Sequence, residues 1–151
     1  SIAQAECCRG SFSFFLMHRI CDGVCRPLQD IINSAGGANS IFSAVATVIE
    51  NRKLEVIKIN PREQKERLVI HVADETCQLF KFTYWGQAAV QASSKFSPGS
   101  IILLDQFIAK SRHSNVIEGF FGENTTTHLL YNKFGMSFEE GRFPILYKLC
   151  M

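Results

Sequence analysis

The segment at residues 76–85 constrains the fold more than any other part of the sequence, because aromatic rings alternate with other side chains along it. Every second position carries a ring: Phe80, Phe82 and Tyr84. The positions between and beside them carry Leu79, Lys81, Thr83 and Trp85. Consecutive residues of a strand point to opposite faces. The alternation therefore predicts a strand with the three rings in a core and Trp85 on the outward face.

Length and composition describe one folded domain. The chain has 151 residues, of which 46% are hydrophobic, and this composition is inconsistent with global disorder. No apolar run approaches the roughly 18 residues that a membrane span needs, and no signal-peptide pattern is visible. The formal net charge is only +2, so any site for a polyanion must be local. Because the sequence begins at Ser1, we expect it to be a fragment of a longer protein.

The order of extended and helical segments predicts an all-β fold with short helices. Strands are expected at 41–50 (continuing at 54–59), 68–73, 76–85, 101–109, 116–121 and 125–131. A lead-in helix is expected at 26–34, and a connector helix at 87–96 between the third and fourth strands. Asp74 and Glu75 are expected to form a solvated turn. This pattern fits a five-stranded Greek-key barrel of the oligonucleotide/oligosaccharide-binding (OB) type, at 26–135, between an amino-terminal arm (1–25) and a tail (136–151).

Three stretches of the barrel carry a resemblance to a known family. They read Leu-Val-Ile-His-Val-Ala-Asp-Glu at 68–75, Thr-Tyr-Trp-Gly-Gln-Ala-Ala at 83–89, and Ser-Pro-Gly-Ser-Ile-Ile-Leu-Leu at 97–104. Their order resembles the OB-fold domains of replication protein A and of related telomere end-protection and DNA-repair proteins. In that family an aspartate-bearing turn joins the second and third strands, and a Trp-Gly or similar pair precedes a helix.

The resemblance implies a non-catalytic module that holds single-stranded DNA across the barrel by base stacking and phosphate contacts. Trp85 matches the position of the family's base-stacking aromatic. Lys81 and Thr83 share its face, so a ring for a base and a cation for phosphate would lie together. In the alternative interpretation, Trp85 packs under the connector helix against Ala88 or Ala89. The resemblance also implies a nuclear protein, and it leaves open whether the ligand is DNA or RNA.

Two loops are expected to contact the nucleic-acid backbone. The loop between the first and second strands contains Arg62, Lys65 and Arg67, but Glu63 and Glu66 are interleaved with them. The loop between the fourth and fifth strands contains Lys110, Arg112 and His113 without an acid until Glu118. The second loop is therefore the better phosphate candidate. His71 could face the same groove, although a histidine satisfied by a neighbour is the commoner case.

A second function class uses the same barrel to hold other subunits of a DNA-maintenance complex. The arm and the tail are rich in apolar residues, which are expected to pack on the barrel or on a partner. The candidate partner-binding residues are Phe14, Phe15, Leu16, Phe143, Leu146 and Leu149. Near-zero net charge also favours this alternative, because a site for a polyanion is usually basic. Fold alone does not determine function.

Catalysis and cofactors have no support in the sequence. No nucleophile elbow, phosphate-binding glycine loop or zinc-protease helix is present, so we expect no enzyme activity and no cofactor. Cysteines 7, 8, 21 and 25 cluster near the amino terminus. Their spacing, with two adjacent cysteines, suits one zinc ion poorly. Reduced and partly buried thiols are the expected state, with a zinc site as the open alternative.

Overall fold

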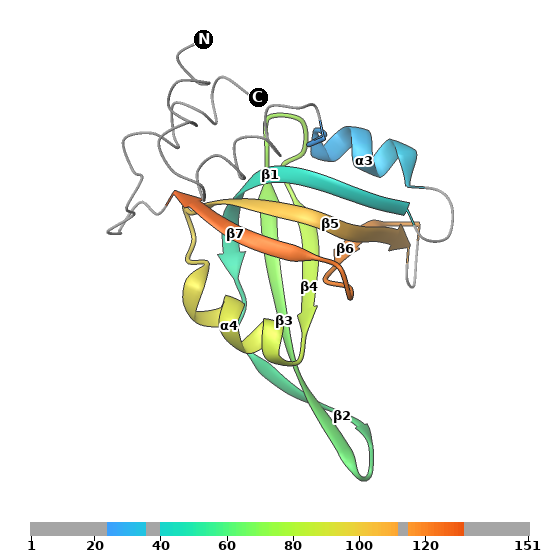
Figure 1. Cartoon of the computed structure of the whole chain (residues 1–151), viewed down its shortest axis with the longest axis vertical. Coiled ribbons are helices and arrows are strands. Elements are labelled where there is room, and N and C mark those ends of the chain that lie inside the picture. The colour runs from blue at the N-terminus through green and yellow to red at the C-terminus, as the bar shows by residue number, and fades with distance from the viewer. Residues whose placement is uncertain (1–23, 36–39, 112–114, 132–151) are drawn as a thin grey trace.

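A computed structural model describes residues 24–35, 40–111 and 115–131. These residues form two helices and seven strands (Figure 1). The helices are α3 (Leu28–Ser34) and α4 (Gln87–Lys95). The strands are β1 (Ser40–Asn51), β2 (Glu55–Asn60), β3 (Glu63–Ala73), β4 (Phe80–Trp85), β5 (Ile101–Ser111), β6 (Ile117–Phe120) and β7 (Thr126–Tyr131). None of the described helices is long and apolar enough to cross a membrane.

The strands close into a ring in the order β1-β3-β4-β6-β5, and β5 pairs again with β1. All of these pairs are antiparallel except β4 with β6, which run parallel. Two further strands are attached to the ring. β7 pairs with β5, and β2 pairs with the first half of β3 in a hairpin that projects away from the barrel (Figure 1).

The predicted closed barrel is confirmed, but the predicted strand count is wrong. The described chain has seven strands, and the connector helix α4 therefore lies between the fourth and fifth of them. The difference arises at residues 54–66. The segment expected to continue the first strand is a separate strand, β2, and most of the expected charged loop is the start of β3. Hairpin pairing stabilises these exposed strands, which lack a buried face that would mark them in the sequence.

The alternation along β4 gives the predicted core. Phe80, Phe82 and Tyr84 are buried inside the ring, as expected. The ring of Phe107 on β5 meets Phe80 and Phe82 edge to face, at centroid distances of 6.0 and 5.5 Å. On β6, a Cβ added at Gly119 would lie 2.7 Å from the Phe82 ring. Only a glycine lets β6 run this close to the aromatic cluster.

The turn at Asp74 attaches helix α3 to the barrel, so the expected solvated turn is wrong for Asp74. One oxygen of the Asp74 carboxylate accepts hydrogen bonds from the backbone N–H of Thr76 and Cys77, at 2.8 and 3.0 Å. The other oxygen accepts one from the backbone N–H of Leu28 at 2.8 Å. That N–H belongs to the first turn of α3, where helix donors lack partners and an anion is favourable. The buried side chains of Leu28 and Ile31 are thereby held against the core.

Replacing Asp74 with alanine is expected to lower the free energy of unfolding by about 2–3 kcal/mol, because the change leaves part-buried backbone donors without an acceptor. Urea denaturation followed by circular dichroism measures the change. The exposed neighbour Glu75 is the matched control, and Glu75→Ala should shift stability by less than about 0.5 kcal/mol. Equal effects of the two substitutions would contradict the attachment of α3 through Asp74.

Helix α4 follows β4 after a turn at Gly86, whose φ of 68° is a conformation that favours glycine,. Ala89 and Ala92 are its buried residues. The side chain of Asn51, at the end of β1, donates a hydrogen bond to the backbone oxygen of Phe96 at 2.7 Å. This bond satisfies one of the free carbonyls at the end of the helix and fixes α4 to β1.

Candidate nucleic-acid interface

The outer face of β3 and β4 brings a tryptophan and an arginine together. Arg67 and Trp85 are direct partners in the antiparallel register of these strands. The guanidinium carbon of Arg67 lies over the Trp85 ring, 5.9 Å from its centroid. Trp85 is half-buried and points outward, as the alternation predicted. A guanidinium over an indole is favourable and leaves a planar surface suited to stacking.

Strand β2 of the hairpin supplies an ion pair that orients Arg67. Its Nη2 donates to the carboxylate of Glu55 on β2 at 2.6 Å, and its Nε is buried without a hydrogen-bond partner among the described residues. Lys65 lies two residues earlier on β3, on the same face as Arg67, and is exposed,. Arg67 was expected only as part of a charged loop. The missing information was the register between β3 and β4, because this register alone places Arg67 beside Trp85.

Thr83 is not available on this face, which corrects the expectation that it contacts nucleic acid. Its side chain is only 3% exposed. The registers place it between Val69 of β3 and Phe120 of β6, both larger than threonine. The parallel pairing of β6 with β4 encloses this position, and no pattern in the sequence indicates that pairing.

The other end of the outer face carries a row of mixed acidic and basic side chains across five strands. Its members in order are Glu50, His71, Lys81, Glu118 and Lys110, which the strand pairings place side by side. Nδ1 of His71 lies 2.9 Å from the Glu50 carboxylate, which confirms the expectation of a satisfied histidine. The Lys81 ammonium lies 3.1 Å from the Glu118 carboxylate. Lys81 therefore lies on the predicted face, but its charge is largely compensated.

Lys110 ends the row at the far side. It is exposed, and its ammonium lies 5.4 Å from the centroid of the Phe120 ring. Arg62 is exposed at the tip of the β2–β3 hairpin, where its backbone N–H donates to the side-chain oxygen of Asn60. The remaining candidates of the second loop, Arg112 and His113, lie outside the described residues. The candidate partner-binding residues of the arm and the tail lie outside them as well.

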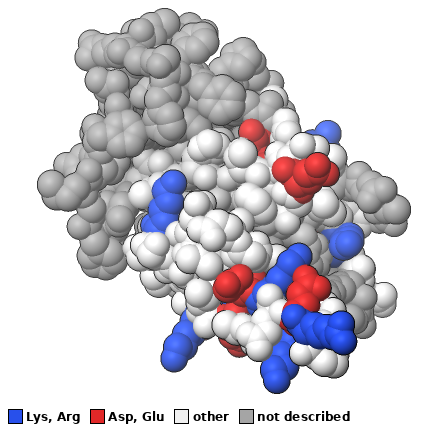
Figure 2. Space-filling view, turned by 60° about the horizontal axis from the view of Figure 1, so that its bottom comes forward, with Lys and Arg blue, Asp and Glu red and all other residues white. Residues whose placement is uncertain are grey.

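Charge on the described surface is mixed. On the face that Figure 2 draws, basic residues stand next to acidic ones and do not join into one band. Next to Trp85 the two cations differ. Arg67 pairs with Glu55, whereas Lys65 has no ion pair to a described residue. On the outer face of β3 and β4, Trp85 is thus accompanied by two paired cations, Arg67 and Lys81, and by the exposed Lys65.

The cysteine cluster is tested only at one position. Cys25 is half-buried, and its backbone bridges to Ser43 of β1. The other three cysteines of the cluster lie outside the described residues. Within the described ranges, histidine, cysteine and acidic side chains form no group of three or more that could hold a metal ion.

Among the comparisons with known proteins, only the comparison of structures supports the fold. No protein-family model matches the sequence, and no curated protein is similar enough in sequence to match. Solved structures do match. One is a replication protein A heterotrimer bound to single-stranded DNA (TM-score 0.53, 14% identity), where the match covers 65% of this chain and 24% of that one. Another is fission yeast Pot1 with single-stranded DNA (TM-score 0.52, 11% identity), covering 93% of this chain and 50% of that one.

A third match is an isolated domain. It is the OB domain of a Thermoplasma acidophilum protein, with a TM-score of 0.50 and 8% identity, and the match covers 70% of this chain and 90% of that one. The chain thus spans a whole small domain but only a part of the larger proteins. The ring order, the parallel β4–β6 pair and these matches agree, and the chain therefore has the OB fold that its sequence predicted.

Proposed function

We propose that this domain binds single-stranded DNA on the outer face of β3 and β4, without catalysis. The observation that carries the proposal is the pairing of Trp85 with Arg67 on that face. A half-exposed indole with a guanidinium over it offers a platform for a base, and base stacking on aromatic side chains is tolerant of sequence. The matched replication protein A and Pot1 structures contain single-stranded DNA, which supports the same ligand here.

The proposed surface runs along β4 from Trp85 to Lys81, a length of about 13 Å. Lys65 lies beside the first end, and Lys110 lies beyond the second. Arg62, Arg112 and His113 remain proposed contacts from the two flanking loops. Such a module fits a nuclear protein of replication, repair or telomere maintenance. Single-stranded RNA is the variant ligand, because nothing on this face depends on the sugar.

A fluorescence-anisotropy titration with short single-stranded oligonucleotides tests the proposal. Saturable binding of oligodeoxynucleotides at micromolar protein and low salt is expected, and duplex DNA should bind more weakly because its bases are not free to stack. An identical titration with oligoribonucleotides separates the two ligands. No measurable binding of either oligonucleotide by the folded parent would defeat the proposal for this domain.

The cations of the surface are expected to contribute unequally. Lys65→Ala should lower the slope of log affinity against log salt by about 0.7, the value for one phosphate contact on a single strand. Lys81→Ala should change the slope less, because its ammonium already pairs with Glu118. Anisotropy titrations over a range of salt concentrations measure both slopes. A larger effect of Lys81→Ala would show that Glu118 releases the lysine when the ligand binds.

The mixed charge of the described surface favours a second function, a scaffold that holds other subunits of a DNA-maintenance complex. The row of acidic and basic side chains from Glu50 to Lys110 suits a protein surface of complementary charge better than a polyanion. The apolar residues of the arm and the tail, Phe14, Phe15, Leu16, Phe143, Leu146 and Leu149, remain its proposed partner contacts. Failure of the oligonucleotide titration would make this the preferred function.

A further inference from the structure

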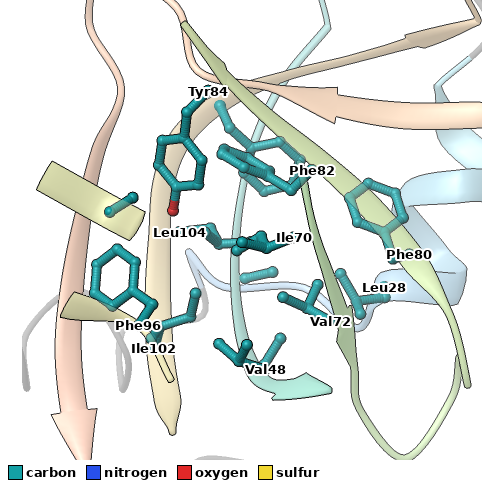
Figure 3. Close-up of a cluster of buried hydrophobic side chains, with 14 of the residues drawn as sticks. Leu28, Val48, Ile70, Val72, Phe80, Phe82, Tyr84, Phe96, Ile102 and Leu104 are labelled. Atoms are coloured by element: carbon teal, nitrogen blue, oxygen red, sulfur yellow. The ribbon is translucent and has the colours of Figure 1, made fainter. Parts of the chain in front are cut away.

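The outer face of β1, β5 and β7 carries apolar side chains that are buried, although they point away from the core. These three strands lie side by side in Figure 1. Leu103 of β5 lies between Ile102 and Leu104, whose side chains belong to the core in Figure 3. The side chain of Leu103 therefore points to the outside of the barrel. Leu103 is nevertheless 0% exposed, and Val45, its direct partner on β1, is 2% exposed.

Strand β7 adds a third buried side chain to this face. Leu130 is 1% exposed but does not belong to the core cluster, whereas Leu129 before it packs against that cluster. Leu130 therefore points to the outside of the barrel as well. We call Val45, Leu103 and Leu130 the outer apolar face.

Neither described helix accounts for the burial of the outer apolar face. Helix α4 packs against β3 and β4, and helix α3 is attached at the turn that follows β3. A single layer of side chains leaves the outward side of a leucine open to water. Complete burial requires a second layer packed on the sheet, about 10 Å away. The gaps at 36–39 and 112–114 are too short to provide this layer over three strands, so it must come from residues 1–23 or 132–151.

The described end of the arm leads away from the outer apolar face. A parallel bridge joins Cys25 to Ser43 of β1, so residue 24 lies toward the start of that strand and away from Val45. Ile41, which lies in that direction, is 59% exposed. The arm therefore joins the barrel next to an outer position that is open to water.

The other end of the chain leaves the barrel at the outer apolar face itself. Strand β7 ends at Tyr131, directly after Leu130. Residues 132–142 can span about 36 Å when extended, and the face is only about 10 Å wide, or two strand spacings. The segment at 143–149 of the tail can therefore return across all three strands. It has one charged residue, Lys148, and its large apolar side chains are Phe143, Ile145, Leu146, Tyr147 and Leu149.

We propose that the segment at 143–149 packs across β1, β5 and β7 and forms the second layer over the outer apolar face. Removal of apolar surface from water on both sides stabilises such a contact. The proposal is independent of the proposed DNA surface, which lies on β3 and β4. It assigns the candidate partner contacts of the tail to the barrel itself, and it leaves those of the arm for the scaffold function.

Methyl NMR of the whole chain tests the proposal without any substitution. We expect NOEs from the methyl groups of Val45 and Leu103 to side-chain protons of residues 143–149, because packed apolar side chains approach within about 4.5 Å. NOEs from these methyl groups to residues 12–17 would assign the face to the arm and overturn the proposal. The absence of NOEs to either segment would overturn it as well. A mixture of labelled and unlabelled chains tests whether the contacts form within one chain, and NOEs between two copies would contradict the proposal.

Two matched variants test which segment excludes water from the face. Leu146→Glu should detach the tail, so relaxation of the Val45 and Leu103 methyl groups by a soluble gadolinium chelate should rise several-fold. Leu16→Glu makes the same change in the arm and should leave this relaxation as in the parent. Circular dichroism shows whether each variant keeps its strands. Unchanged relaxation in a folded Leu146→Glu variant, or an equal rise in both variants, would contradict the proposal.

Discussion

Replacing Phe82 with alanine is expected to lower the free energy of unfolding by about 3–5 kcal/mol, the range for truncating a buried aromatic side chain. The side chain is 0% exposed at the centre of the barrel, among the residues drawn in Figure 3. It meets Tyr84 at a centroid distance of 4.9 Å and Phe107 at 5.5 Å, both edge to face. The loss therefore has three parts: the hydrophobic burial of the ring, the cavity that its removal leaves, and two ring contacts.

Chemical denaturation of the variant and the parent measures this loss. Leu79→Ala is the control, because Leu79 directly precedes β4 but is 61% exposed. The control should change stability by less than about 0.5 kcal/mol. Gly119→Ala offers an independent test of the same cluster, since the added Cβ would lie 2.7 Å from Phe82 and 2.9 Å from Phe80. A Phe82→Ala variant as stable as the parent would mean that these rings do not form the core.

The core could be predicted from the sequence because it follows from a local pattern. Strand alternation depends only on neighbouring residues, and the buried face of β4 appeared as predicted,. The β2–β3 hairpin could not be predicted in the same way. Its residues are mostly exposed, including the apolar Val56 and Ile59, so no buried face marks the pairing. Pairing between two strands stabilises it, and composition does not encode that pairing.

The site was predictable only in part, for a related reason. The outward direction of Trp85 is local information, but its neighbour Arg67 depends on the register between two strands. The burial of Thr83 depends on β6, whose paired residue is Phe120. The contact between Asp74 and Leu28 joins residues that are 46 positions apart. These facts arise from tertiary pairing, which a single sequence leaves open.

Replacing Trp85 with alanine is expected to weaken the binding of single-stranded DNA by about 1–3 kcal/mol, the cost of losing one stacked base. The substitution also removes the ring under Arg67, so the guanidinium keeps only its pair with Glu55. The loss should persist as salt rises, because stacking does not depend on counterion release. The effect of Lys65→Ala should shrink under the same conditions.

Trp85→Phe is the matched control for this prediction. It keeps a ring on the outer face and should retain most of the affinity, since every aromatic ring can stack on a base. Anisotropy titrations at low and moderate salt measure the three variants, and thermal melting confirms that each is folded. If Trp85→Ala binds like the parent at both salt concentrations, the indole only orders Arg67. The outer face of β3 and β4 would then not be the DNA surface, and the scaffold would become the preferred function of this barrel.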